Sequence, residues 1–195
     1  MGNTFALRIL FKKLAESVKQ PLSFTRIANI VSSTGAKVGT QTVINYIEYA
    51  KDAWLINPEQ NIAGKLVDIE TSPKYYYTDN GILNLFLLDA NTSLLENLVA
   101  VNLLRKYDHN DAVYFYNQGI EVDFYIPDVC TTIQVCYNLD NSDGTFDRKV
   151  KALLKITEVL ECNKLLIIIR DTERTLEVGD KTIEVLPIWK WLLDL

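Results

Sequence analysis

The sequence predicts a mixed α/β protein made of two units, and two observations support this. Apolar residues recur at helical spacing over the first fifty residues, whereas short alternating or wholly apolar runs, typical of strands, dominate after residue 110. Residues 1–66 hold eight basic and four acidic side chains, whereas residues 67–195 hold twelve and twenty-one. Because pattern and charge change together, we expect two units with different roles, 1–77 and 78–195.

Composition excludes several classes of protein. The 195 residues are 48% hydrophobic and 10% aromatic, which is enough for a packed core and excludes extensive disorder. The formal net charge of −5 excludes a uniformly basic nucleic-acid-binding protein. The single histidine, His109, excludes a His-rich zinc site and leaves a Ser-His-Asp arrangement only one candidate base.

The cellular setting is inferred from what the sequence lacks. The three cysteines form no CxxC pair, which favours reduced thiols over a disulfide framework. No signal-peptide pattern is visible, and no apolar run approaches the roughly 20 residues of a membrane span. We therefore expect a cytoplasmic protein with no membrane partner.

Three helices and two strands are predicted in the first unit. Pro21 ends the first helix, Ser23 caps the second, and Thr40 is the expected cap of the third. A loop of small and polar residues should join the strands. The predicted ranges are helices 4–19, 24–32 and 40–51 and strands 54–56 and 74–77. This order is that of a winged helix-turn-helix.

In a winged helix-turn-helix, the third helix is the one that contacts DNA. Its exposed side should present Gln41, Thr42 and Asn45, whose side chains suit base edges. Lys51 is its only basic residue, and Glu48 on the same side would repel phosphate. Two interpretations therefore remain for this helix, which are contact with DNA and packing against another protein module.

The second unit is predicted to alternate helices and strands. Asp79 should cap a short helix that runs to residue 88, and residues 117–119 and 179–180 should form hairpin turns. The wholly apolar run 165–169 indicates a buried central strand. The further predicted ranges are helices 93–107, 146–160 and 188–195 and strands 113–116, 120–126, 132–136, 165–169, 176–178 and 183–186.

The second unit is predicted to have the order helix, three strands, helix and strand (αβββαβ). This order resembles the core of the PD-(D/E)xK nuclease-like fold. Glu96 matches the acidic residue of its first helix, and Asp123 matches that of its second strand. Gln134 stands where the third strand has an acid, and Cys136 stands where it has the lysine. The resemblance implies Mg²⁺ held by Glu96 and Asp123, with Gln134 offering only a neutral oxygen.

The helix that follows the third strand offers possible replacements for the missing lysine. Arg148, Lys149 and Lys151 are expected on its outward face, and Lys149 or Lys151 would act from a displaced position. We expect Glu96 and Asp123 to face each other across a shallow groove, with Gln134 alongside.

Five segments in order carry a closer resemblance, namely 74–81, 95–100, 121–124, 133–137 and 187–193. Together they resemble the C-terminal half of prokaryotic AAA+-like P-loop ATPases, where a winged helix and a PD-(D/E)xK-like domain of unknown function follow the ATPase module. The sequence contains no G-x-x-x-x-G-K-[ST], so we expect no ATP binding by this chain. The resemblance implies a preceding ATPase module in the full-length protein.

Three functions follow from these observations. The leading one is a non-catalytic recognition and regulatory region of a prokaryotic ATPase that contacts nucleic acid or a protein partner. The first alternative is a Mg²⁺-dependent nuclease that uses Glu96, Asp123 and Gln134 as a degenerate site. The second alternative is a winged-helix transcription regulator.

Overall fold

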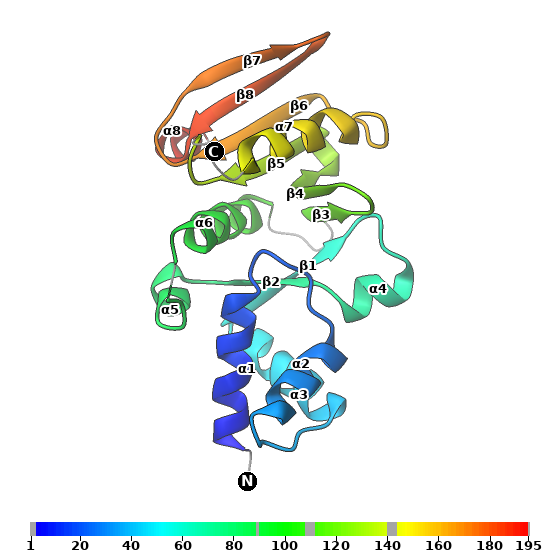
Figure 1. The fold of residues 1–195 in the computed structure, drawn as a ribbon, viewed down its shortest axis with the longest axis vertical. Helices are drawn as coiled ribbons and strands as arrows, with labels where there is room; N and C mark the ends of the chain where they lie inside the picture. The colour runs from blue at the N-terminus through cyan, green and yellow to red at the C-terminus, as the bar shows by residue number, and fades with distance from the viewer. Residues whose placement is uncertain (1–2, 89, 108–111, 140–143, 195) are drawn as a thin grey trace. The chain divides into compact units, whose positions relative to one another are not determined.

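A computed structural model describes residues 3–88, 90–107, 112–139 and 144–194. His109 lies outside these residues. The chain forms two compact units. Unit 1 contains Met1–Gln60 and Lys65–Asn97, and unit 2 contains Asn61–Gly64 and Leu98–Leu195. The protein is mixed α/β, as predicted (Figure 1).

The division between the units differs from the one expected at residue 77. The side chain of Asn97 accepts a hydrogen bond from the Tyr77 amide (2.8 Å) and donates one to the Tyr77 carbonyl (2.8 Å). It also donates to Oδ1 of Asn80 (2.9 Å). Hydrogen bonds from the Asn97 side chain therefore join residues on both sides of the expected boundary at residue 77. Sequence spacing does not reveal these bonds.

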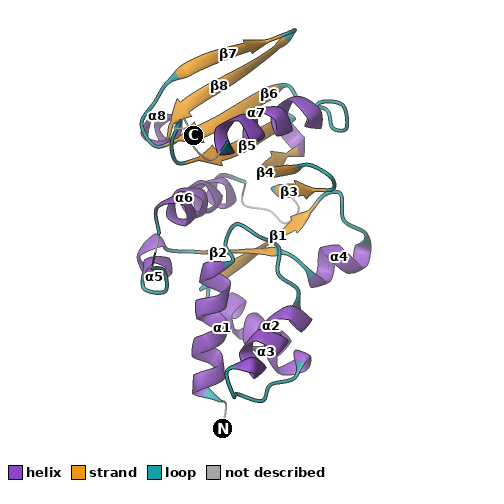
Figure 2. Ribbon diagram, in the orientation of Figure 1, coloured by secondary structure: helices purple, strands orange, loops and turns teal. Residues whose placement is uncertain are grey.

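Unit 1 is mainly helical around a two-stranded ladder (Figure 2). Its elements are α1 (Thr4–Glu16), α2 (Phe24–Ser33), α3 (Thr40–Asp52), β1 (Ile56–Asn61), α4 (Leu66–Thr71), β2 (Lys74–Tyr77) and α5 (Asn80–Asn84). The connection between the strands, predicted as a loop, contains α4. The antiparallel ladder pairs Ile56 with Tyr77 and Glu59 with Lys74.

Side-chain caps set several of these helix ends. Ser23 accepts a hydrogen bond from the Arg26 amide, and Asp79 accepts one from the Ile82 amide, as predicted. The prediction for Thr40 was wrong. Gly39 occupies the N-cap position of α3 and makes no side-chain cap, so Thr40 is the first helical residue.

The first strand begins two residues later than predicted because α3 ends in a Schellman motif. The Leu55 amide bonds the Ala50 carbonyl (2.9 Å), and the Trp54 amide bonds the Lys51 carbonyl (2.9 Å). Trp54 occupies the position that usually holds glycine, with φ of 54°. This left-handed conformation is incompatible with a strand, so β1 begins at Ile56.

Unit 2 is an α/β arrangement. Helix α6 (Asn91–Lys106) enters it at Leu98. The remaining elements are β3 (Tyr114–Asn117), β4 (Glu121–Ile126), the 3₁₀ helix η1 (Pro127–Val129), β5 (Thr131–Cys136), α7 (Thr145–Ile156), β6 (Lys164–Ile169), β7 (Arg174–Val178), β8 (Lys181–Pro187) and α8 (Ile188–Leu193).

In unit 2 the strands follow the hydrogen-bonded order β3-β4-β5-β6-β8-β7. Within unit 2, β3, β4 and β5 are antiparallel neighbours, whereas β5, β6 and β8 are parallel. Strand β7 returns antiparallel to β8, which confirms the hairpin predicted at residues 179–180. Ile62 of this unit donates its amide to the Phe115 carbonyl (3.0 Å).

The core of unit 2 lies between α7 and the sheet, and Figure 1 shows the helix lying along one face of these strands. Phe146 and Leu153 of α7 pack with Leu165, Ile167 and Ile169 of β6. Strand β6 is buried from its second residue onward, as predicted for its apolar run.

None of the helices in the described residues is both long enough and apolar enough to cross a membrane.

Candidate functional site

Asp123 is the centre of a buried polar cluster in unit 2. The residue is 2% exposed in the middle of β4. Its Oδ2 accepts a hydrogen bond from the Val135 amide of the neighbouring strand β5 (2.7 Å). The same oxygen contacts Nζ of Lys149 at 2.5 Å. A buried carboxylate is therefore held by both a backbone donor and a cation.

Lys149 points inward, and the prediction that it lies on the outward face of its helix was wrong. It is 8% exposed, whereas Arg148 and Lys151 are exposed as expected. The buried residues of α7 include Phe146, Lys149, Leu153 and Ile156, spaced by three, four and three. This spacing places Lys149 on the apolar face of the helix. Burial is tolerated because the ammonium contacts a carboxylate.

Gln134 completes the cluster. Its Oε1 accepts a hydrogen bond from Lys149 Nζ (2.9 Å), and its Nε2 donates to the Glu121 carbonyl (2.7 Å). The glutamine stands on β5, next to β4 along the sheet, so neighbouring strands bring the three side chains together. The oxygen that the resemblance assigns to a metal is thus bound to an ammonium group.

The remaining position of the expected motif has no charge. Cys136 is 4% exposed and donates its thiol to the Asn138 carbonyl (3.0 Å). It packs in the core beneath α7. It therefore behaves as a small apolar residue with a weak donor.

Glu96 lies in a second buried cluster, in unit 1. It is 3% exposed on α6, accepts a hydrogen bond from the Tyr76 hydroxyl (3.1 Å) and lies 3.6 Å from Lys74 Nζ. Glu96 belongs to unit 1 and Asp123 to unit 2. The expected meeting of Glu96 and Asp123 in one groove therefore stays a prediction.

The set of possible metal ligands is small. Across the described ranges, no group of three or more His, Cys, Asp or Glu is placed to hold a metal ion. Asp123 and Glu96 each contact a lysine instead. A hard cation such as Mg²⁺ prefers several oxygen ligands. At Asp123 it would compete with Lys149 for the oxygens of both Asp123 and Gln134, so the residues as arranged do not fit the ion.

An open hollow of about 690 Å³ adjoins the Asp123 cluster. Glu121 belongs to both the cluster and the hollow. Its backbone carbonyl accepts a hydrogen bond from Gln134 Nε2, and Glu121 also lines the hollow. Six of the ten residues that line the hollow are charged or polar, and the lining comes from the β3–β4 turn and from α7. It consists of Asn117, Gly119, Ile120, Glu121, Gly144, Asp147, Arg148, Lys151, Ala152 and Lys155.

The third helix presents the side chains that the sequence predicted. Gln41 and Asn45 are exposed, and Gln41 donates to Asn45 (3.1 Å), while Thr42 is half-buried. Lys51 forms an ion pair with Glu48 at 3.0 Å. The one basic residue of this face therefore lies beside an acidic one, so the net charge offered to phosphate here is small.

Sequence reasoning correctly placed Asp123 and Gln134 on neighbouring strands but placed Lys149 on the wrong side of its helix. The signal was present, because Lys149 stands three residues after Phe146 and four before Leu153. Because lysine is rarely buried unless paired, the sequence alone favours a solvent-exposed side chain at this position. Its partner, Asp123, is 26 residues away, and only the folded sheet brings the two side chains together.

Comparison with known proteins gives relatives without an assigned function. Residues 2–94 match the family described as "Domain of unknown function (DUF8612)". The chain is 30% identical to the uncharacterized protein MJ1544 of Methanocaldococcus jannaschii, covering 98% of this chain and 45% of the relative. It is 26% identical to an uncharacterized protein of Haemophilus influenzae, covering 98% and 47%. No solved structure matches significantly. The chain therefore spans about half the length of the curated relatives it matches.

Proposed function

We propose that this chain is a non-catalytic recognition and regulatory region of a prokaryotic ATPase, with a winged-helix unit followed by a nuclease-like unit. Its partner in this proposal is a nucleic acid or a protein. The observation that carries the proposal is the ion pair between Lys149 and Asp123, because Asp123 is a residue that the resemblance assigns to the metal.

The order of elements supports the fold proposed for each unit. Helices α1, α2 and α3 precede the β1–β2 ladder, which is the order expected of a winged helix-turn-helix. Helix α6, strands β3, β4 and β5, helix α7 and strand β6 follow the αβββαβ order of the nuclease-like core.

The chemistry of the cluster supports a non-catalytic role. Metal-dependent phosphodiester cleavage needs a cation that polarises the phosphate and activates water. Here Asp123 Oδ2 already accepts from Lys149 and from the Val135 amide, while Gln134 Oε1 accepts from Lys149. Displacing Lys149 would leave its charge without a partner in a buried site, which is unfavourable by several kcal/mol (about 3–5).

The link to an ATPase rests on the resemblance of the five sequence segments. The relatives are about twice as long as this chain, which leaves room for a further module of similar size. Since this chain has no P-loop sequence, ATP with Mg²⁺ should leave its thermal unfolding midpoint unchanged. An upward shift that increases with ATP concentration would contradict this part of the proposal.

One observation favours the alternative of a nuclease. Lys149 lies 2.5 Å from Asp123 and 2.9 Å from Gln134, so α7 supplies the cation that Cys136 does not. A lysine at this point would stabilise developing negative charge on a phosphate. The third candidate, a winged-helix transcription regulator, has weaker support because Lys51 is paired with Glu48.

A combined cleavage and binding assay tests the proposal. Single-stranded, duplex and branched DNA would be offered with Mg²⁺ or Mn²⁺ to the wild-type chain and to Asp123→Asn, which keeps the shape of the side chain. We expect binding without metal-dependent cutting in either protein. Cutting by the wild type that the folded Asp123→Asn variant lacks would establish the nuclease and overturn the non-catalytic proposal. Absence of both activities would leave a protein as the partner.

A further inference from the structure

We infer that the hollow beside α7 binds the sugar-phosphate backbone of a nucleic acid, with Arg148, Lys151 and Lys155 as its cationic contacts. This inference rests on the proposed function and names the partner and the place of contact, which is in unit 2 rather than on the exposed face of α3.

The three cations share one side of the helix. Their spacing of three and four residues aligns them along α7, and all three line the hollow. From Arg148 to Lys155 the helix rises roughly 10 Å, at about 1.5 Å per residue. One strand of a duplex carries a phosphate about every 3.4 Å of axis, so this row spans roughly three phosphates.

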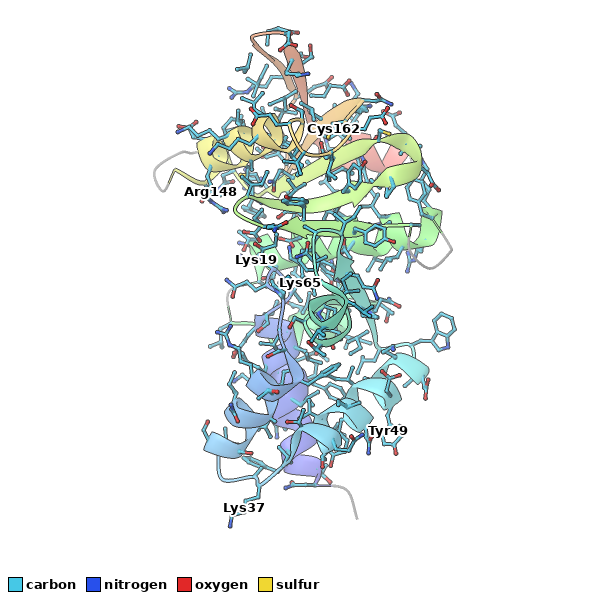
Figure 3. All side chains as sticks on the ribbon, turned by 90° about the vertical axis from the view of Figure 1, so that its right-hand side faces the viewer. Lys19, Lys37, Tyr49, Lys65, Arg148 and Cys162 are labelled. Atoms are coloured by element: carbon cyan, nitrogen blue, oxygen red, sulfur yellow. The ribbon has the colours of Figure 1, made fainter. Side chains whose placement is uncertain are left out.

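Two of the cations are available for a ligand. Lys151 and Lys155 are exposed, and neither has an ion pair within the described part of the chain. Arg148 lies 3.6 Å from Glu121 with its side chain 60% exposed, a pairing that contributes little in water. Figure 3 shows the Arg148 side chain extending away from its helix.

Acidic residues also line the hollow. Glu121 and Asp147 offset part of the positive charge. The row of cations continues past them, because Lys151 and Lys155 lie one and two turns further along α7 than Asp147. Phosphates should therefore lie toward the Lys155 end of the hollow, away from the two carboxylates.

The rim of the hollow leaves room for a nucleic-acid backbone to approach closely. Gly119 in the β3–β4 turn has φ of +78°, and a Cβ at Gly119 or Gly144 would meet no atom within 4 Å. Ile120 and Ala152 are the apolar residues among those that line it. Pockets for small organic ligands are mainly apolar, whereas six of the ten residues that line this hollow are charged or polar. The composition suits a charged backbone better than an apolar ligand.

Helix α7 offers more basic side chains than α3, which supports placing the nucleic-acid contact at the hollow. The single cation of α3, Lys51, is held by Glu48 at 3.0 Å, whereas α7 offers a row of three. Since phosphate contacts supply most of non-specific affinity, the hollow should contribute more binding than the predicted recognition helix.

The test measures fluorescence anisotropy of labelled 20-nucleotide single-stranded and duplex DNA between about 50 and 200 mM salt. The double variant Lys151→Ala/Lys155→Ala should bind roughly tenfold more weakly. Its plot of log K against log salt should be less steep by about 1–2, because each lost phosphate contact removes a slope of about 0.7–0.9. These side chains are exposed, so thermal unfolding should change little.

Two matched controls separate location from total charge. Lys164→Ala/Lys181→Ala removes the same charge from unit 2 outside the hollow and should leave affinity and slope near wild type. Gln41→Ala/Lys51→Ala tests the exposed face of α3 and should have a smaller effect than the α7 variant.

The outcomes distinguish this inference from the proposed function. Wild-type binding that the α7 variant retains, with an unchanged salt slope, would overturn the inference and leave nucleic-acid recognition intact. No wild-type binding to either DNA would overturn the inference and leave only the protein partner of the proposed function. Binding to anionic lipid vesicles but not to DNA would also overturn it.

Discussion

Each unit contains a buried lysine paired with a carboxylate, and the two pairs differ in how tightly they are held. In unit 2, Lys149 contacts Asp123 at 2.5 Å, and Gln134 and the Val135 amide add further hydrogen bonds. In unit 1, Lys74 lies 3.6 Å from Glu96. The same two chemical groups therefore form a compact, hydrogen-bonded cluster in one unit and a longer contact in the other.

The difference bears on function, because Asp123 and Glu96 are the two acids that the sequence assigned to a metal. Each is instead bound to a lysine of its own unit. Buried ion pairs add little net stability over apolar residues, but removing one partner is strongly destabilising. The two pairs should therefore respond differently to the loss of one charge.

The largest effect is expected for Asp123→Ala. It leaves Lys149 as a buried charge without its carboxylate, so the free energy of unfolding should fall by about 3–5 kcal/mol. Urea unfolding followed by circular dichroism measures the change. The double variant Asp123→Leu/Lys149→Met removes both charges and should lose only about 1–2 kcal/mol, mainly because the Val135 amide loses its acceptor. Equal losses in the two variants would contradict the interpretation as an ion pair.

A smaller loss, about 1–3 kcal/mol, is expected for Glu96→Gln. Glu59 is buried and directly opposite Lys74 in the β1–β2 ladder, so a second carboxylate remains to offset the charge. The same urea measurement applies. Tyr76→Phe is the control, because it removes only the hydroxyl that donates to Glu96. If Glu59 compensates, Glu59→Gln/Glu96→Gln should lose more than the sum of the single variants.

Alkaline pH should weaken unit 1 through β2. Burial raises the pKa of Tyr75, with a contribution from the charge of Glu48, and burial also raises the pKa of Tyr77. The folded state therefore favours the neutral phenols. Stability should be constant below about pH 10, the ordinary tyrosine pKa, and fall above it by about 1.4 kcal/mol per pH unit for each tyrosine.

Urea unfolding between about pH 8 and 11 measures this slope. Tyr77→Phe should reduce the slope by about 1.4 kcal/mol per pH unit, since it removes one titrating group. At neutral pH the variant should lose about 0.5–1.5 kcal/mol, because the Tyr77 hydroxyl donates to the Phe11 carbonyl (2.7 Å). An unchanged alkaline slope would assign the effect to other groups.

The smallest effect expected is a gain in stability. Trp54 is 80% exposed and has φ of 54°, a conformation that disfavours a side chain by about 1–2 kcal/mol. Trp54→Gly should raise the free energy of unfolding by about 1 kcal/mol. The change is measured by thermal unfolding, with Tyr49→Gly, a glycine placed inside α3, as a control that should destabilise. Destabilisation by Trp54→Gly would show that the indole makes stabilising contacts.

Local patterns were sufficient to predict most elements. Apolar spacing located α1, α2 and α3, the run 165–169 located β6, and Gly179 with Asp180 located the β7–β8 hairpin. Each of these signals depends on residues close together in the chain. The sequence predictions were wrong where the folded chain departs from the usual local preference of its residues. Trp54 adopts a conformation usual for glycine, and α4 lies in a stretch expected to be a loop.

The sequence by itself determined the α/β class, the order of the elements other than α4 and η1, and the placement of Asp123 and Gln134 on adjacent strands. Tertiary structure alone decided where Lys149 points. A lysine on a helix is stable in solvent or in the core, and the outcome depends on whether a buried carboxylate lies within reach. Asp123, distant in sequence and brought near by the packing of α7 on the sheet, meets that condition. Through this contact Lys149 pairs with Asp123, one of the two carboxylates that the resemblance assigns to a metal.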